Sequence, residues 1–283
     1  MNIAFFGSPS FAVPCLKALL ASRHAIVCVL TQPDKPSGRS RTINPTPVKT
    51  ISSQAGIPTF TPEKVSKEID AIFAQLKTKP DIIVTCAFGQ ILRQNVLDAC
   101  KFGVINVHAS LLPKYRGASP VPYTIMNGET RTGITIMQTD IGIDTGDILT
   151  QSEIDILPDE TSGELLERLA NIAPKLLENT LDLIEKGAIL PRKQGISPTI
   201  YCKMIEKSDG KIDFSKGAKE IVDFVRAMNP WPCAWAESTH GIIKVYKSHL
   251  ERGDLVIDLV QGEGGKIMPL RDFKNGHKGF EFK

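Results

Sequence analysis

Val104-Ile-Asn-Val-His-Ala-Ser-Leu-Leu-Pro-Lys-Tyr-Arg-Gly-Ala-Ser-Pro120 decides the fold, together with Gly133-Ile-Thr-Ile-Met-Gln-Thr-Asp-Ile-Gly-Ile-Asp-Thr-Gly-Asp147. Each stretch begins with an apolar run rich in β-branched residues, 104–107 and 134–137, and such runs are typical of buried parallel strands. Polar residues and turn formers follow each run, and ligands bind at the carboxyl edge of an open α/β sheet. Asn106 and His108 share one strand face at spacing i, i+2. We therefore expect them to meet Asp144 from the loop after the second run.

These three side chains make chemical sense as a group. An amide donates to a developing oxyanion, an imidazole exchanges a proton near neutral pH, and a carboxylate orients or deprotonates a partner. The sequence pairs no Ser, Cys or Lys nucleophile with them, which favours direct transfer between two bound substrates over a covalent enzyme intermediate. Asn and His at strand ends also serve as ordinary turn or capping residues, and spacing alone leaves that alternative open.

Longer motifs carry a resemblance to a known family. They are Asn106-x-His108, Ser110-Leu-Leu-Pro113, Arg116-Gly117, Asp140-x-Gly-x-Asp-Thr-Gly146, Phe6-Gly-Ser-Pro-x-Phe-Ala12, Thr31-Gln-Pro-Asp-Lys-Pro-Ser-Gly-Arg39, Pro45-x-Pro-Val-Lys49 and Asn229-Pro-Trp-Pro232. In this order, and over nearly the whole chain, the sequence resembles the 10-formyltetrahydrofolate-dependent formyltransferases, most closely those that act on methionyl-tRNA. The resemblance implies a doubly wound, Rossmann-like α/β formyltransferase domain and a small C-terminal OB-like β-barrel domain. The C-terminal segment is shorter than is usual in the family, so the sequence leaves open whether this barrel is complete or reduced.

The resemblance also implies roles for single residues. It makes Asn106, His108 and Asp144 catalytic. It implies contacts with the folate co-substrate, 10-formyltetrahydrofolate, for Ser110, Leu111, Leu112, Pro113, Phe88, Ile91 and Asp140. Phe88 and Ile91 are equally consistent with ordinary core packing, and Arg116 is open between binding an anion and packing near the mouth of the site.

The acceptor implied by the resemblance is the α-amino group of methionyl initiator tRNA. A proline-rich loop at 31–49 contains four basic residues against one acid, and phosphate contacts from such residues are salt-sensitive. We expect Lys35, Arg39 and Arg41 to contact the tRNA. The nearest alternative is an N-formyltransferase for an amino-sugar nucleotide with the same donor, and another is a catalytically inactive folate- or RNA-binding relative. The basic loop and Asn229–Pro232 favour tRNA, and the intact triad argues against inactivity.

Composition and missing motifs exclude other classes of protein. The chain has 283 residues, 42% of them hydrophobic, and a net charge of +3, which permits an RNA partner without requiring one. Six cysteines without CxxC spacing indicate reduced thiols, not a metal site. The Asp140–Asp147 loop lacks the ligand pattern of an EF-hand, and the turn at Gly7 lacks GxGxxG, so we expect neither metal nor NAD. No membrane span or signal peptide is evident, and we expect a cytoplasmic monomer.

The order of the predicted elements indicates three segments. We expect a catalytic domain at 1–187, a linker at 188–206 and an OB-like tRNA-binding domain at 207–283. Thr161-Ser-Gly-Glu164 is a capping box that predicts a long helix ending near Lys186. A second helix is expected at about 216–228, with Ser215 as its N-cap.

Overall fold

The structure, a computed structural model, describes residues 1–37, 42–199 and 201–283. By contacts the chain forms two compact units that interleave along the sequence. The N-terminal unit comprises Met1–Arg116, Gly133–Glu153 and Glu167–Thr199, and the C-terminal unit comprises Gly117–Thr132, Ile154–Leu166 and Ile200–Lys283. Because these units are defined by contacts, they do not test the predicted segment boundaries, which stay a prediction.

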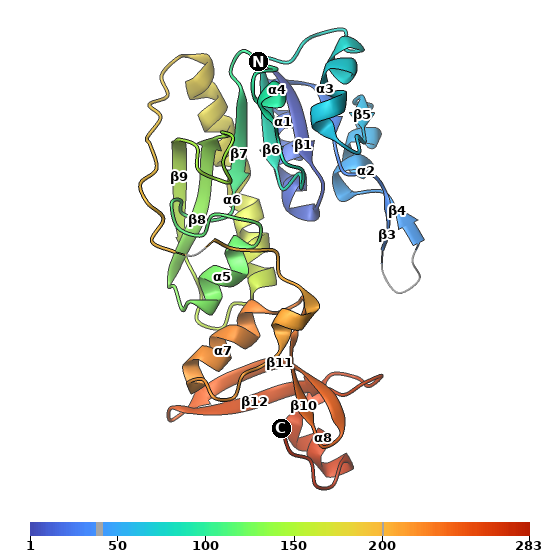
Figure 1. Cartoon of the computed structure of the whole chain (residues 1–283), viewed down its shortest axis with the longest axis vertical. Helices are drawn as coiled ribbons and strands as arrows, with labels where there is room; N and C mark the ends of the chain where they lie inside the picture. The colour runs from blue at the N-terminus through green and yellow to red at the C-terminus, as the bar shows by residue number, and fades with distance from the viewer. Residues whose placement is uncertain (38–41, 200) are drawn as a thin grey trace. The chain divides into compact units, whose positions relative to one another are not determined.

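A seven-stranded sheet dominates the N-terminal unit, with strand order β5-β2-β1-β6-β7-β8-β9 (Figure 1). The strands are β1 (Asn2–Gly7), β2 (Ala25–Leu30), β5 (Thr59–Phe60), β6 (Ile82–Cys86), β7 (Val104–His108), β8 (Arg131–Gln138) and β9 (Ile148–Asp155). The pairs β2–β5, β1–β2, β1–β6 and β6–β7 are parallel. The strand order places β1 at the centre of the parallel part, with β2 and β6 beside it, as in a doubly wound α/β fold.

The second apolar run is a strand, as predicted, but its direction was predicted wrongly. β8 pairs antiparallel to β7, with Ile105 opposite Gln138 and His108 opposite Thr135. A continuous apolar run indicates that both faces of a strand are buried, and a strand in a mixed sheet meets that condition in either direction. The carboxyl end of β8 therefore lies opposite the start of β7, and the loop after β8 must turn back to reach Asn106.

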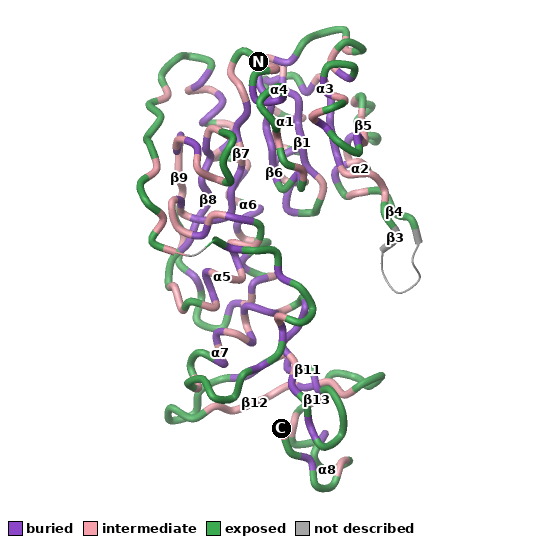
Figure 2. The backbone as a smooth tube through the Cα atoms, viewed as in Figure 1, coloured by how far each residue is buried: buried purple, intermediate pink, exposed green. Residues whose placement is uncertain are grey.

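Helices cover the faces of this sheet. They are η1 (Ser10–Ala12), α1 (Val13–Ala21), α2 (Pro47–Gln54), α3 (Val65–Ala74), α4 (Gln94–Leu97) and α6 (Ser162–Glu185). The apolar face of α3, with Val65, Ile69 and Ile72, packs into a buried cluster with residues of β1, β2 and β6. Figure 2 shows the resulting burial of β1, β6 and β7 along almost their whole length. The backbone of β7 is thus held from both sides, which gives its side chains a fixed base.

The proline-rich loop forms a small hairpin of its own. β3 (Lys35–Ser37) pairs antiparallel with β4 (Thr42–Asn44), and α2 begins soon afterwards at Pro47. Thr46 caps α2 by accepting from the Lys49 N–H. The Lys49 ammonium also bonds the Asp34 carboxylate at 2.6 Å, which ties the two ends of the loop together.

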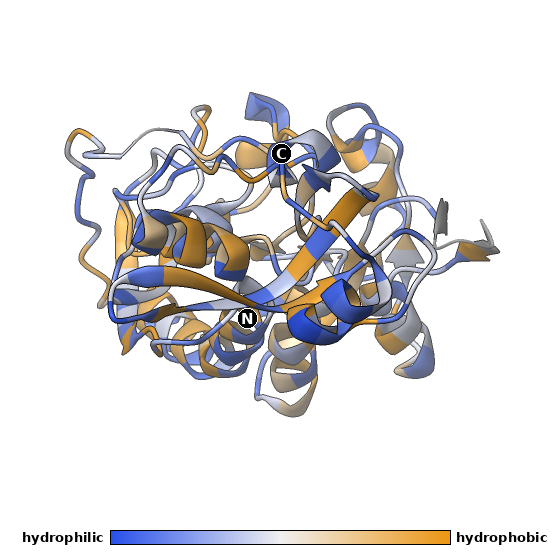
Figure 3. Ribbon diagram, turned by 90° about the horizontal axis from the view of Figure 1, so that it is seen from below, coloured by the Kyte–Doolittle hydropathy of each residue, from blue (hydrophilic) through white to orange (hydrophobic). Residues whose placement is uncertain are grey.

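The C-terminal unit contains a four-stranded sheet in the order β10-β11-β12-β13. Its elements are α5 (Pro120–Met126), η2 (Lys207–Gly210), α7 (Ala218–Ala227), β10 (Ala234–Ser238), β11 (Gly241–Glu251), β12 (Asp254–Gln261), β13 (Met268–Pro269) and α8 (Leu270–Gly276). All three pairings are antiparallel. Figure 3, which colours the ribbon of the chain by hydropathy, shows hydrophobic and hydrophilic residues mixed along its elements. Within the described ranges β13 does not pair with β10, so the sheet is the reduced form of the expected barrel and is not closed.

The start of α7 differs from the prediction. Its N-cap is Gly217, and the Glu220 carboxylate accepts from the Gly217 N–H at 3.1 Å. The predicted cap, Ser215, instead bonds the Asp213 carboxylate with both its N–H and its hydroxyl. Asp and Ser side chains that bond nearby backbone compete with helix capping in this way.

None of the helices in the described part of the chain is both long and apolar enough to span a bilayer.

Candidate functional site

Asn106 and His108 both lie on β7, and neighbouring strands orient them. Thr85 on β6 is in register with Asn106. Its hydroxyl donates to Asn106 Oδ1 at 2.8 Å and lies 3.1 Å from the Ile105 carbonyl oxygen. The Asp144 carboxylate on the other side of the amide can only accept, so Nδ2 faces Asp144 and Oδ1 faces the Thr85 hydroxyl. The Asn106 Nδ2 donor is thereby directed away from β6 and toward Asp144.

Asp144 reaches the same place from the Asp140–Asp147 loop. One of its carboxylate oxygens accepts from Asn106 Nδ2 at 3.5 Å, and the other lies 3.6 Å from His108 Nδ1. The second distance is an ion-pair contact and is too long for a hydrogen bond. The structure therefore brings together all three residues that the sequence predicted to be catalytic.

The imidazole of His108 is buried, with 5% of the residue exposed. Its Nε2 lies 3.0 Å from the carbonyl oxygen of Tyr115, which can only accept. Nε2 therefore carries a proton in this contact, while Nδ1 faces the Asp144 carboxylate. The ring is therefore held at its Nε2 edge, which leaves Nδ1 as the ring atom available to a substrate beside Asp144.

The loop that carries Asp144 is tightly wound. Asp140 accepts from the Gly142 N–H at 3.1 Å and from the Thr145 hydroxyl at 2.7 Å. A Cβ on Gly146 would lie 1.9 Å from the Gln138 carbonyl oxygen, so only glycine fits there. Asp144 itself has a φ of 52°. This winding returns the chain to β7 although β8 runs antiparallel to it.

The residues predicted to contact folate in the turn 110–113 differ in how far they are buried. Ser110 and Leu112 are buried, and Thr135 bonds the carbonyl oxygen of the first and the N–H of the second. Gln151 donates to the Leu112 carbonyl oxygen. Leu111 and Pro113 are half-buried. The polar backbone of this turn is thus largely used within the protein, which leaves its apolar surface as the part offered to a ligand.

Phe88 and Ile91 differ sharply in environment although they are close in sequence. Phe88 is 4% exposed and its ring centroid lies 5.1 Å from that of Phe6, inside a core cluster. Ile91 is 82% exposed. Phe88 therefore packs as a core residue, whereas Ile91 presents an apolar side chain to solvent.

The predicted tRNA contacts are only partly within the described residues. Lys35 is exposed at the start of β3. Arg39 and Arg41 lie outside the described residues.

No group of three or more His, Cys, Asp or Glu side chains in the described ranges has the geometry of a metal centre.

Three residues of the site were missed from the sequence. They are Thr85, Tyr115 and Gln194, and only Tyr115 lies beside one of the motifs. Gln194 donates from Nε2 to the carbonyl oxygens of Asp144 at 2.9 Å and Gly146 at 2.7 Å. Its position in an aperiodic stretch predicted as a linker carried no local signal for such a contact.

A cysteine close to the site is not a nucleophile. Cys86 follows Thr85 at the end of β6 and is buried. Burial is the main cause that raises the pKa of its thiol well above the ordinary value, and a hydrogen bond with Cys15 adds to the effect. A thiol kept neutral in this way is unreactive at neutral pH, in agreement with direct transfer between bound substrates.

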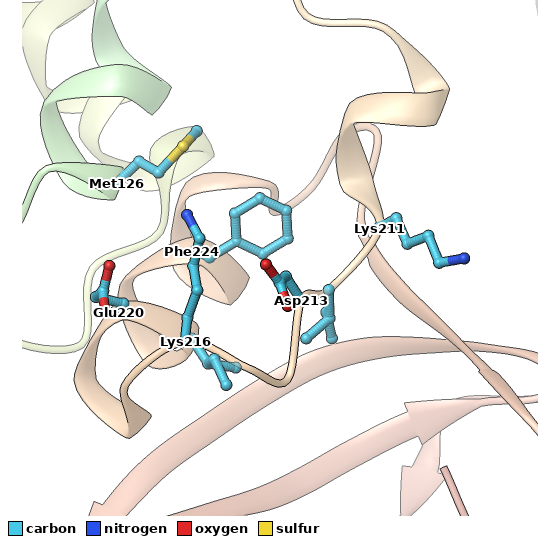
Figure 4. A pocket seen from close by; sticks show the side chains of 8 residues that line it. Met126, Lys211, Asp213, Lys216, Glu220 and Phe224 are labelled. Atoms are coloured by element: carbon cyan, nitrogen blue, oxygen red, sulfur yellow. The ribbon is translucent and has the colours of Figure 1, made fainter. Parts of the chain in front are cut away.

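A separate small pocket lies wholly within the C-terminal unit (Figure 4). Its volume is about 80 Å³. The lining residues are Met126, Lys211, Ile212, Asp213, Lys216, Glu220, Ile221 and Phe224. None of these was predicted as a site residue, and the pocket is far smaller than the roughly 300–1,000 Å³ of typical ligand sites.

Comparisons with known proteins bear on this geometry. The family model described as "Formyl transferase" matches residues 1–181, and "Formyl transferase, C-terminal domain" matches 204–254. A methionyl-tRNA formyltransferase of Citrifermentans bemidjiense is 40% identical over 300 aligned residues, covering 98% of this chain and 94% of the relative.

Solved structures show the same fold. A sugar 3N-formyl transferase, solved with dTDP and 5-N-formyl-THF, aligns over 95% of this chain and 97% of its own with a TM-score of 0.68 and 21% identity. A methionyl-tRNA formyltransferase from Clostridium thermocellum aligns over 95% and 99% with a TM-score of 0.60 and 17% identity. Similarity at this level of identity supports the fold, whereas the curated relative at 40% identity extends over almost the full length of both chains. The chain therefore belongs to the methionyl-tRNA formyltransferase family.

Proposed function

We propose that this protein transfers a formyl group from 10-formyltetrahydrofolate to the α-amino group of methionyl initiator tRNA, in the cytoplasm, for translation initiation. The observation that carries the proposal is the convergence of Asn106, His108 and Asp144 on one point, in a chain of this family. The acceptor is taken from the curated relative, because the triad alone does not distinguish among acceptors that carry an amine.

The triad supports formyl transfer through an oxyanion. The acceptor amine attacks the formyl carbon, and negative charge develops on the formyl oxygen. Asn106 Nδ2 and the Nδ1 side of the His108 imidazolium stabilise that charge, because Thr85 orients the amide and Tyr115 holds the ring at Nε2 before the reaction begins. The Asp144 carboxylate receives the proton of the amine directly or through a water molecule. The oxyanion then re-forms the C=O bond while the bond from carbon to N10 of the folate breaks, and N10 takes up the proton that Asp144 received from the amine.

A folate-type donor fits the surface beside β7. The turn 110–113 exposes parts of Leu111 and Pro113 while its polar backbone is held by Thr135 and Gln151. A pterin ring is flat and largely apolar on its faces, and such a surface suits it. We assign Ser110 and Leu112 to the support of this turn and Asp140 to the folding of the loop that carries Asp144.

The tRNA assignment also uses the charge of the hairpin loop. Lys35 is exposed on β3, and Arg39 and Arg41 follow it in the sequence. We propose that these three residues contact tRNA phosphates, which makes acceptor binding weaker as salt concentration rises.

A parallel assay of three acceptors tests the proposal. Purified protein is given 10-formyltetrahydrofolate with charged initiator tRNA, charged elongator tRNA or an amino-sugar nucleotide, and Asn106→Ala serves as the matched inactive control. We expect formylation of initiator methionyl-tRNA at the highest kcat/KM. Formylation of the sugar alone would support the alternative acceptor, which the fold similarity to a sugar formyl transferase makes a specific rival. Absence of transfer to all three would leave a binding protein.

A further inference from the structure

We propose that Gln194, held by Arg116, is a positioning residue that keeps the Asp144 carboxylate at the triad; the inference rests on the proposed function. The Gln194 Nε2 amide donates to the carbonyl oxygens of Asp144 and Gly146, at 2.9 and 2.7 Å. These two carbonyls flank the turn that directs the carboxylate toward Asn106 and His108. Gln194 therefore holds the backbone of the loop on the C-terminal side of its turn.

The Gln194 amide has its full set of partners. Its Oε1 accepts from Arg116 Nε at 3.0 Å and from Arg116 Nη2 at 2.8 Å. Arg116 Nη2 also donates to the Gly195 carbonyl oxygen at 3.1 Å. A glutamine amide has two donors and two acceptor sites, and all four are used here. Guanidinium groups only donate and carbonyls only accept, so the direction of the amide is determined by its partners.

The Asp144 backbone needs such a support. Its φ of 52° is in the left-handed region, which non-glycine residues rarely adopt. Strained residues of this kind persist only where surrounding contacts hold them. Asp140 ties Gly142 and Thr145 on one side of the loop, and Gln194 ties residues 144 and 146 on the other.

The Tyr115–Arg116 segment, which holds Gln194, also positions the His108 imidazole. The Tyr115 carbonyl oxygen contacts His108 Nε2 at 3.0 Å, and the next residue, Arg116, holds Gln194. His108, Tyr115–Arg116, Gln194 and Asp144 thus form a closed series of contacts. A shift of the Arg116 segment would move the imidazole and the carboxylate together, which links their separation to one piece of backbone.

The test compares Gln194→Glu and Gln194→Ala with wild type in the formyl-transfer assay. The glutamate variant keeps the length and the Arg116 contact but places an oxygen against two carbonyl oxygens. For both Gln194 variants we expect kcat to fall by about 10²-fold, because a displacement of about 1 Å in a catalytic group costs that much. We expect the KM for the acceptor to change by less than about threefold, because the loss is in the chemical step. Gln75→Ala is the matched control, since the Gln75 amide donates to a single carbonyl within α3.

Two further measurements separate positioning from general stability. In the Asp144→Ala background, Gln194→Ala should cause no further loss of kcat, because residues that act as a unit are not additive. Hydrogen exchange of the 140–147 amides should become faster in Gln194→Ala and not in Gln75→Ala. An unchanged kcat, full additivity with Asp144→Ala or unchanged exchange would overturn the inference. A wild-type protein that formylates no acceptor would overturn the proposed function, and the inference with it.

Discussion

At the scale of single residues, the proposed mechanism depends on donors that are oriented before substrate arrives. Asn106 Nδ2 is aimed by Thr85, His108 is held at Nε2 by Tyr115, and Asp144 faces both. Preorganised donors in a partly buried site stabilise an oxyanion more effectively than water does, because they need no reorganisation during the reaction. Each of these contacts therefore yields a kinetic prediction.

Removing a triad side chain should slow the chemical step. Loss of one oxyanion donor typically raises the barrier by about 2.7–4 kcal/mol. We expect Asn106→Ala and Asp144→Ala each to reduce turnover by about two orders of magnitude or more, with an unchanged circular dichroism spectrum and melting temperature. Single-turnover formylation with saturating tRNA measures this directly. A variant that retains turnover within about tenfold of wild type would remove that residue from the mechanism.

Thr85 gives a subtler prediction. Thr85→Val keeps the shape of the side chain but removes the hydroxyl that donates to Asn106 Oδ1. The Asn106 amide can then rotate, and we expect kcat to fall by about tenfold, which corresponds to roughly 1.4 kcal/mol or one hydrogen bond. Thr85→Ser should restore most of the rate, because it keeps the donor. Equal rates for the valine and serine variants would show that the hydroxyl has no orienting role.

At the scale of elements, α6 shows how a local signal sets a boundary. The Thr161 N–H and hydroxyl both donate to the Glu164 carboxylate, at 2.9 and 2.7 Å, and the Thr161 hydroxyl oxygen accepts from the Glu164 N–H at 3.3 Å. This is the capping box expected from the sequence, and α6 begins at Ser162 directly after it. Gly187, just past the end of the helix, has a φ of 65°, as expected for a helix stop.

The capping box should make stability depend on pH. Hydrogen bonds from the Thr161 N–H and hydroxyl lower the pKa of the Glu164 carboxyl. A carboxyl group with a lowered pKa in the folded state stabilises the protein above its unfolded-state pKa, and this contribution is lost as pH falls through the folded-state pKa. We expect Thr161→Ala to reduce the free energy of unfolding by about 1 kcal/mol near neutral pH.

Urea unfolding of wild type, Thr161→Ala and Glu164→Ala at several pH values measures this effect. The difference between wild type and Glu164→Ala should be constant near neutral pH and should shrink once the pH falls below about 4.5, the ordinary range of a glutamate. Thr50→Ala is a matched control, because the exposed Thr50 hydroxyl donates to the Thr46 backbone carbonyl oxygen, a group that does not titrate. A wild-type advantage that grows with acidity would contradict the assigned sign.

The elements predicted best are those with strong local patterns. α6 starts directly after the predicted capping box at Thr161 and ends one residue before the predicted Lys186. The direction of β8 was predicted wrongly because an apolar run indicates burial and carries no information about pairing. The N-cap of α7 was predicted wrongly because Asp213 engages Ser215, which depends on local turn geometry.

The candidate site shows the same division. The proximity of Asn106, His108 and Asp144 was predicted because they lie within motifs of the family and near strand ends. Gln194 was not found, because its contacts with the Asp144 loop join residues 50 positions apart in a stretch without periodicity. The sequence also led to Asp144 through a wrong intermediate step, a parallel β8. The glycines of its loop are what return it to β7.

At the scale of the whole molecule, the burial of the six cysteines indicates how accessible the interior is to solvent and reagents. All six are free thiols, five of them buried and Cys100 half-buried. Burial raises the pKa of the Cys28 and Cys100 thiols to about 12, and it raises the pKa of Cys233 as well. Reaction with disulfide reagents requires the thiolate. These groups should therefore be almost entirely neutral at pH 8 while the protein is folded.

Thiol labelling gives the corresponding prediction for the intact protein. With Ellman's reagent at pH 8, we expect slow reaction of the native protein and rapid reaction of all six thiols in guanidinium chloride, which exposes them to the reagent. Because a raised pKa suppresses the thiolate, the native reaction should accelerate as pH is increased toward 10. Cys100 should react first because it alone is half-buried, and Cys100→Ser should remove that phase. Several thiols that react rapidly at pH 8 without denaturant would show that these cores open far more readily than their burial indicates.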